Sequence, residues 1–467
     1  MADDLHYATL TGTTARIARG ALSVAEATEA HLARIAALDG GLMSYSHVTA
    51  ERARARAAML DAELAKGICR GPLHGAQIGV KDLCDTDFAP TTAGTRIFRG
   101  RVPETSATLV ERLERAGAVV LGKLKMTEGA YTSHHPEDPT PINPWGAGHW
   151  VGSSSTGSGV ATSAGLCQGS IGSDTGGSIR FPSATCGLTG MKPTWGRVSR
   201  AGVFPLADSL DHLGPMCRTA ADAAAMLGVM AGADPRDPTA LVDPVPDYLA
   251  ALSGDLRGLT IGVSRDYALG ASEPEVAATW EASLAVLERL GARLREVAFP
   301  DFERLVELWI PMCAVETAYA HRLTYPERKA EYGPALAQLI EEGLETPGTA
   351  IAEATTRRLD FKGALRAMFR DCDMILVPAM PVKVPTLAAM ADYGAEPQRL
   401  LDILRFTAPF DFSGSPALTF PAGFDTAGLP VAMQLVGPHL SEAALFRAGD
   451  AFQRVSDFHA RRPPGFP

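Results

Sequence analysis

Serine, threonine and glycine dominate one thirty-residue stretch, residues 151–180, and this stretch constrains the fold more than any other. Two clusters lie in it, GSSSTGS at 152–158 and GSDTGGSIR at 172–180, with an apolar segment of small residues at 160–167 between them. An apolar run between Gly/Ser-rich breakers is typical of a buried helix between two tight loops, with a short strand before the second loop. A flexible Ser/Gly linker is the plainer interpretation, but a linker would lack the apolar helix.

Two kinds of chemistry use loops of this composition. The first is phosphate binding by backbone N–H groups, but no lysine follows the glycines and the dinucleotide pattern G-x-G-x-x-G is absent. The second is nucleophilic catalysis, in which a serine lies beside backbone donors that stabilise an oxyanion. Glycine adopts backbone angles that other residues avoid, so the N–H groups of Thr175, Gly176, Gly177 and Ser178 can converge on one point. The pattern favours the second chemistry.

A serine nucleophile needs a base, and Lys81 is a candidate. It ends the apolar segment QIGVKDL at 77–83, where a buried strand would carry its side chain into the protein. An ordinary lysine, with a pKa of about 10.4, is almost fully protonated at pH 7, so burial must lower that pKa. A histidine with an acid behind it is the commoner partner, but G-x-S-x-G is absent around the candidate serines. A surface ion pair is the plain alternative for such a lysine.

Three segments together resemble the amidase signature family. They are GVKD at 79–82, GSSSTGS at 152–158 and GSDTGGSIRFP at 172–182, and the two serines that match the family pattern are 24 residues apart. The resemblance extends over nearly the whole chain, including SLDHLGPM at 209–216 and GSPAL at 414–418. The chain departs from the family pattern within the first serine cluster, where Ser153 and Thr156-Gly157 replace the usual residues.

The resemblance implies a role for each matching residue. Ser178 is the nucleophile, Ser154 is a bridging serine that follows a cis peptide bond, and Lys81 is the base. The N–H groups of Thr175, Gly176 and Gly177 form the oxyanion hole.

Tyr131 precedes a long loop, residues 132–150, and the resemblance makes it a substrate-binding candidate. Loops of this length inside a compact domain are usually functional. His134, His135 and His149 lie in this loop, but their spacing is not that of metal ligands, so pocket lining or plain surface is the better interpretation. No cofactor or metal is expected.

The implied reaction is hydrolysis of a carboxylic amide through an acyl-enzyme. Apolar residues around 309–316 favour small amides with apolar or aryl groups. A carbamate or urea-derivative hydrolase would use the same three residues, and the signature-bearing component of a tRNA-dependent amidotransferase, its A subunit, shares the motifs. An A subunit is expected to carry an acidic residue five positions before the proline that corresponds to Pro409. This chain has Leu404 at that position, which argues against the amidotransferase alternative. A silent binding protein with this fold is a further alternative.

Composition excludes several other classes. The net charge is −10 with no basic stripe, so nucleic acid is not an expected ligand. The chain has seven scattered cysteines and no C-x-x-C, which favours a reducing, cytoplasmic location. No apolar run approaches 18 residues and the first residues do not form a signal peptide, so we expect no membrane association. A homodimer is the assembly that the resemblance implies.

Strand and helix patterns alternate along the chain, which predicts an α/β fold. A strand at 77–81, a helix at 105–116 and a strand at 118–121 begin the series, and further strands are expected at 259–263, 374–378, 416–420 and 430–436. The resemblance implies one large domain with a mixed, twisted central sheet covered by helices on both faces. Within it, residues 1–70 are expected to be an N-terminal helical segment packed on the catalytic region, residues 71–467.

Overall fold

A single eleven-stranded sheet organises the chain in this computed structural model, which describes residues 5–325, 327–395 and 397–466. The strand order is β1-β3-β2-β4-β6-β5-β10-β11-β9-β7-β8. Parallel pairs join β2 to β3 and β4, whereas β4–β6 and β10–β11 are antiparallel, so the sheet is mixed as expected. The strands are β1 (Tyr45–Val48), β2 (Gln77–Lys81), β3 (Val119–Leu124), β4 (Gly169–Asp174), β5 (Thr189–Lys192), β6 (His212–Cys217), β7 (Thr260–Val263), β8 (Arg293–Glu296), β9 (Met374–Pro378), β10 (Ala417–Phe424) and β11 (Pro430–Val436).

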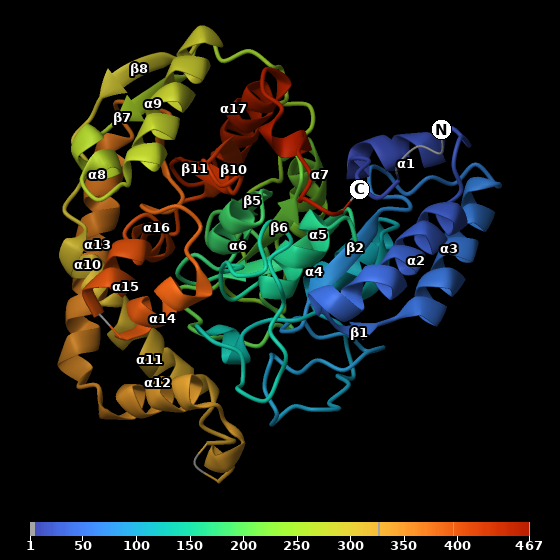
Figure 1. Cartoon of the computed structure of the whole chain (residues 1–467), viewed down its shortest axis with the longest axis horizontal. Helices are drawn as coiled ribbons and strands as arrows, with labels where there is room; N and C mark the ends of the chain where they lie inside the picture. The colour runs from blue at the N-terminus through green and yellow to red at the C-terminus, as the bar shows by residue number, and fades with distance from the viewer. Residues whose placement is uncertain (1–4, 326, 396, 467) are drawn as a thin grey trace.

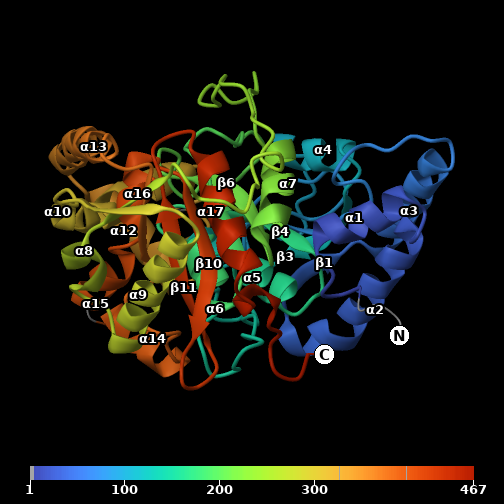
Figure 2. The ribbon, with the colours of Figure 1, turned by 90° about the horizontal axis from the view of Figure 1, so that it is seen from above.

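Helices pack along both faces of this sheet. In Figures 1 and 2, α1, α2 and α3 lie at one end of the molecule and α8, α10, α12 and α13 at the other. The principal helices are α1 (Leu10–Ala18), α2 (Val24–Leu42), α3 (Ala50–Leu64), α4 (Thr108–Arg115), α5 (Thr156–Ser163), α6 (Arg180–Thr185), α7 (Ala220–Met230), α8 (Arg265–Leu269), α9 (Pro274–Arg289), α10 (Glu303–Glu307), α11 (Trp309–Ala320), α12 (Pro334–Glu345), α13 (Gly348–Met368), α14 (Leu387–Ala395), α15 (Pro397–Leu404), α16 (Ala408–Ser413) and α17 (Glu442–Arg454).

Strand β2 shows how the sheet divides its side chains between two cores. Ile78 and Val80 join the large cluster that includes residues of α4 and α7. Alternation along a strand then directs Gln77 and Lys81 to the opposite face, where Thr28 of α2 donates to the Gln77 side chain. The second cluster on that face unites residues of α2, α3 and α5. Lys81 therefore enters the face that α5 covers.

The N-terminal segment differs in one respect from the expectation. Helices α1, α2 and α3 are present, but Tyr45–Val48 forms β1, which pairs antiparallel with β3 at the sheet edge. The segment thus contributes a strand to the central sheet as well as a layer of helices. None of the helices within the described residues is long and apolar enough to cross a bilayer.

Candidate active site

Lys81 meets the two serine-rich clusters at the carboxyl ends of β2 and β4. These parallel strands are neighbours, so their last residues lie at one edge of the sheet. The Nζ atom of Lys81 lies 2.7 Å from Ser154 Oγ, 2.9 Å from Ser155 Oγ and 2.7 Å from Ser173 Oγ. Ser154 and Ser155 come from the loop before α5, and Ser173 comes from β4. The structure therefore brings together the expected pair of Lys81 and Ser154, and adds two hydroxyl groups.

The surroundings of Lys81 favour a neutral amine. The side chain is fully buried, and burial lowers its pKa to about 7. Among the described residues no carboxylate lies within ion-pair distance of Nζ, and the adjacent Asp82 pairs instead with the Nζ of Lys123 at 3.4 Å. A neutral amine has a lone pair that accepts a proton from a neighbouring hydroxyl. Burial and the three hydroxyl contacts are therefore the features of Lys81 that bear on a role as general base.

Lys192 shows why a lowered pKa alone does not identify a base. Burial lowers its pKa to about 7 as well, but its Nζ donates to the backbone carbonyl of Ser415 at 2.6 Å. A carbonyl oxygen has no proton to give, whereas the hydroxyls around Lys81 do. Lys123 donates to the Cys84 carbonyl at 2.7 Å and to the hydroxyls of Thr86 and Thr91, but unlike Lys81 it also has a carboxylate partner, Asp82. Of these three buried lysines, Lys81 alone contacts the serine-rich clusters.

Ser154 is held by the backbone on both sides. The peptide bond between Ser153 and Ser154 is cis, as the resemblance implied. The carbonyl of Ser154 accepts a hydrogen bond from the N–H of Thr127 at 3.2 Å. Gly152 has φ +78°, and a side chain there would collide with the backbone of Pro182. The loop that carries Ser154 thus packs against the backbone at Pro182, just after the second serine-rich cluster, and holds the Ser154 hydroxyl beside Lys81.

Ser178 lies in the tight turn between β4 and α6. Gly177 has φ +132°, which a residue with a side chain rarely adopts, and an added Cβ would lie 2.4 Å from the Phe181 ring. Ser178 is 8% exposed, and its hydroxyl has no hydrogen-bond partner within the described chain. It therefore remains available to a bound molecule.

A buried carboxylate shapes this turn. Asp174 accepts hydrogen bonds from the N–H groups of Gly177 at 2.7 Å and Ile179 at 3.0 Å, and it pairs with Arg180 at 2.8 Å. Burial opposes ionisation of Asp174, but attraction to Arg180 outweighs it and holds the pKa of Asp174 below its usual range. Arg180 also pairs with Asp411 of α16 at 2.6 Å. The ion pair beside Ser178 thus extends to a third residue, which lies 231 positions from Arg180 in the sequence.

The turn leaves several backbone donors open. The N–H groups of Thr175, Gly176 and Ser178 have no acceptor within the described residues. The N–H of Gly177 differs from the expectation, because in this structure it is bonded to Asp174. Gly177 therefore contributes its backbone conformation to the turn, and its neighbours contribute the open donors.

Trp309 of α11 holds the same turn from outside, a contact that the sequence did not reveal. Its indole Nε1 donates to the Thr175 carbonyl at 2.9 Å. A Cβ on Gly176 would lie 2.5 Å from the Trp309 ring, so the ring packs directly against the turn. Only glycine at 176 allows this approach.

The long loop at 132–150 contacts the start of α5. Burial lowers the pKa of His134 to about 4, and its Nε2 lies 3.1 Å from the Thr156 hydroxyl at the start of α5. Tyr131 is half-buried, and its carbonyl accepts from the Thr127 hydroxyl at 2.5 Å. Within the described residues no group of three or more His, Cys, Asp and Glu side chains is arranged to hold a metal ion.

Comparison with known proteins places this site in a family. The Amidase family pattern matches residues 26–446, so the chain belongs to the amidase signature family. The protein named "Putative amidase AmiD" of Mycobacterium tuberculosis is 47% identical over 450 residues, which cover 95% of this chain and 93% of that protein. The chain is therefore an amidase by family.

Two further relatives show the breadth of the family. The glutamyl-tRNA(Gln) amidotransferase of Chloroflexus aggregans has an A subunit that is 39% identical over 486 residues, covering 98% of this chain and 99% of that protein. The solved structure of the native peptide amidase from Stenotrophomonas maltophilia superposes with a TM-score of 0.84 at 30% identity, covering 100% of this chain and 99% of that chain. These likenesses confirm the expected amidase signature fold.

Proposed function

We propose that this amidase hydrolyses small carboxylic amides through an acyl-enzyme on Ser178, with Ser154 as the bridge and Lys81 as the base. The observation that carries the proposal is the contact of 2.7 Å between the buried Lys81 Nζ and the Ser154 hydroxyl, without a carboxylate partner for the amine among the described residues. A lysine in this setting takes up a proton near neutral pH.

The proton moves along the three residues in two opposite directions. Neutral Lys81 accepts the proton of Ser154, and Ser154 accepts that of Ser178 as the Ser178 oxygen attacks the amide carbonyl. The C–N bond then breaks, and the proton returns through Ser154 to the leaving amine. Water repeats the sequence and releases the acid from the ester on Ser178. Ser178 must approach Ser154 when substrate binds, and catalytic hydrogen bonds commonly shorten at that stage.

The turn before Ser178 supplies the oxyanion hole in this proposal. The open N–H groups of Thr175, Gly176 and Ser178 belong to one turn, and the backbone conformation of Gly177 shapes that turn. One such donor contributes about 3–4 kcal/mol to stabilising the transition state.

The proposed substrate has an apolar or aryl group. Trp309 packs against Gly176, so an apolar surface borders the place where the carbonyl would lie. Tyr131 is proposed to line the same pocket, since it follows the Thr127 segment that contacts Ser154. No step of the mechanism requires a metal or an organic cofactor.

Hydrolysis of a nitroanilide by the purified chain tests the proposal, beside Ser178→Ala and Ser158→Ala. Ser158 lies in the same buried cluster, but its hydroxyl donates to the carbonyl of Ile171 and does not contact Lys81. We expect Ser178→Ala to abolish product formation and Ser158→Ala to retain it. Full activity in Ser178→Ala would refute the proposed nucleophile.

The amidotransferase relative supports a second candidate, release of ammonia from glutamine within a complex. The same assay separates the two functions, because a partner-dependent enzyme would leave simple anilides, esters and carbamates uncleaved on its own. Hydrolysis of carbamates in preference to anilides would instead favour the carbamate or urea-derivative reaction, which the same three residues can perform.

We further propose a cytoplasmic homodimer. The seven cysteines are all unpaired and six of them are buried, as suits a reducing compartment. Light scattering after gel filtration would give the mass in solution, and a mass of one chain would refute the dimer.

A further inference from the structure

Asp211 is a buried carboxylate that the mechanism above does not use. It lies just before β6, within the SLDHLGPM segment, and is 8% exposed. Its Oδ1 accepts from the Thr175 hydroxyl at 2.5 Å and from the N–H of Ala207 at 3.2 Å. Its Oδ2 accepts from the N–H of Leu206 at 3.0 Å. No cation lies within ion-pair distance among the described residues, so only neutral donors hold this carboxylate.

Thr175 is fixed from two sides as a result. Asp211 holds its hydroxyl, and Trp309 donates to its carbonyl at 2.9 Å. Two anchors on one residue leave its N–H pointing in a defined direction. That N–H is one of the open donors of the proposed oxyanion hole, so Asp211 acts on the hole through Thr175.

The segment that carries Asp211 is in turn fastened to α11 and α13. The Leu206 carbonyl accepts from the Thr317 hydroxyl at 3.1 Å, and the Ser209 hydroxyl donates to Glu316 at 2.6 Å. Arg358 donates to the Ser209 carbonyl at 2.8 Å. Asp211 therefore has little freedom to move away from Thr175.

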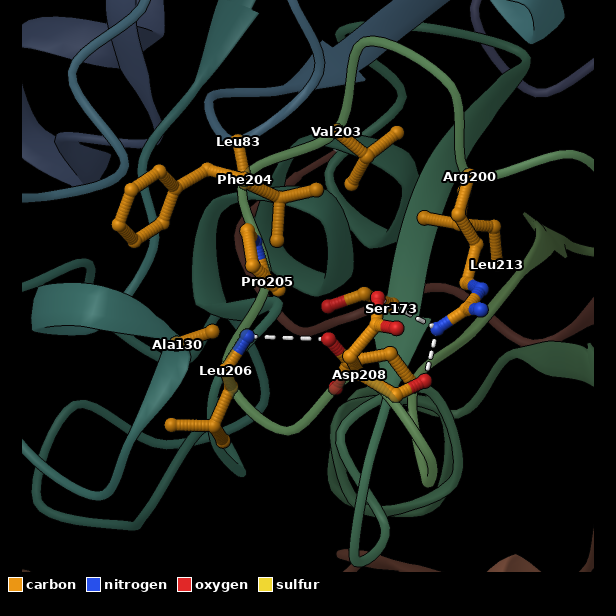
Figure 3. Close-up of a pocket in the computed structure, with 11 residues that line it drawn as sticks. Leu83, Ala130, Ser173, Arg200, Val203, Phe204, Pro205, Leu206, Asp208 and Leu213 are labelled. Carbon is orange, nitrogen blue, oxygen red and sulfur yellow. Dashed lines mark hydrogen bonds and ion pairs between the residues drawn. The ribbon is translucent and has the colours of Figure 1, made fainter. Parts of the chain in front are cut away.

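A small cavity is lined by both Asp211 and Ser173, a residue that contacts Lys81. Its volume is about 10 Å³, roughly that needed for one water molecule. Ser173, Leu206, Asp208 and Arg200 surround it in Figure 3, and Asp211 also lines it. Ser173 is the residue whose hydroxyl lies 2.7 Å from Lys81 Nζ.

We propose that Asp211 is a positioning residue of the amide hydrolysis, which holds Thr175 in the oxyanion turn and acts electrostatically on Lys81 across the cavity behind Ser173. The inference rests on the proposed function. Burial raises the pKa of Asp211 to about 6, against the three hydrogen bonds that it accepts, so the carboxylate is largely ionised at pH 7 and above.

Several charged or titratable groups surround this pair. Lys81 ends β2, Cys84 follows it and Asp174 ends β4. Arg200 and Asp208 lie in the segment before β6, and His212 begins β6. Helix α11 contributes Cys313 and Glu316. Arg200 pairs with Asp208 at 2.9 Å, and burial raises the pKa of Cys84 to about 12, so that thiol stays neutral. The negative charge of Asp211 raises the pKa of Lys81, against the larger effect of burial, which lowers it.

Two variants separate the hydrogen bond of Asp211 to Thr175 from its electrostatic effect on Lys81. In Asp211→Asn we expect kcat to fall at least about tenfold with KM within about threefold, because a transition-state interaction is lost. We also expect the acid limb of the pH profile to move to lower pH, because Lys81 loses a neighbouring negative charge. Thr175→Val removes the hydroxyl anchor but keeps the charge, so kcat should fall while the acid limb stays in place.

Asp208→Asn is the matched control. It makes the same change of charge on a residue that lines the same cavity, but its side chain is 74% exposed and does not contact Thr175. We expect kcat and the pH profile of this variant to match the wild type. Should Asp211→Asn fail to fold, as judged by circular dichroism, Thr175→Val carries the test through its kcat.

Labelling of Ser178 in the wild type by an aryl fluorophosphonate distinguishes a failure of the inference about Asp211 from a failure of the proposed function. If Ser178 is labelled but Asp211→Asn has wild-type kcat and an unmoved acid limb, the inference about Asp211 is wrong. An equal shift of the limb in Asp208→Asn would also overturn it. If Ser178 of an active wild type is not labelled, the proposed function itself fails.

Discussion

Activity should depend on pH through the neutral form of Lys81. Burial lowers the pKa of this lysine to about 7, so about half of the molecules carry a neutral amine at pH 7. For an ordinary lysine the neutral share would be less than about 0.1%. As pH rises through the lowered pKa the amine loses its proton, so activity should rise with pH. With one titrating group, kcat/KM at about pH 6 should be roughly a tenth of its value on the alkaline plateau.

The assay is kcat/KM for a nitroanilide between about pH 5 and 9, beside the same profile for Lys81→Arg. Arginine keeps a long cationic side chain but does not lose its proton, so this variant should lose at least about 1000-fold at every pH. A wild-type profile that is flat across this range would refute the role of Lys81 as base. So would an Lys81→Arg variant with more than about a tenth of wild-type activity at its optimum.

Three other changes test neighbouring parts of the site. Ser154→Ala should lower kcat at least about 100-fold with little change in KM, because the proton relay is interrupted, and a change in KM alone would contradict the relay. Gly176→Ala places a Cβ 2.5 Å from Trp309 and should lower kcat about 100-fold, whereas Gly148→Ala, with nothing within 4 Å of its Cβ, should leave kcat unchanged. Equal activities in these two glycine variants would argue against the turn as oxyanion hole. Asp174→Asn leaves the buried Arg180 with one carboxylate fewer and should lower the free energy of unfolding, measured by urea titration, by about 3–5 kcal/mol. A loss below about 1 kcal/mol would show that the ion pair does not stabilise the turn.

Local sequence patterns predicted the elements that carry the proposed catalytic residues. Strand β2 occupies residues 77–81 as expected, because an apolar run that ends in Lys81 fits a buried strand. The helix after the first serine cluster begins at Thr156 rather than at residue 160. Small residues explain the difference: a Cβ on Gly157 would lie 2.3 Å from the Ser44 carbonyl, so the polar first turn is buried against backbone.

Contacts between distant segments could not be predicted in the same way. Trp309 and Thr175 are 134 residues apart, and Asp211 and Thr175 are 36 apart, so no local periodicity records either pair. Strand β8 was missed because its sequence RLRE lacks an apolar alternation and is largely exposed at the sheet edge. Strand β1 was missed because it is only four residues long and lies in the short segment 43–49 between two helices.

Covalent labelling of the nucleophile tests the central claim most directly. The wild type would be treated with an aryl fluorophosphonate, digested and analysed by mass spectrometry, with loss of nitroanilide hydrolysis followed in parallel. We predict one adduct, on Ser178, formed in step with the loss of activity, and none in Ser178→Ala. An adduct on another residue that tracks the loss of activity would contradict the account.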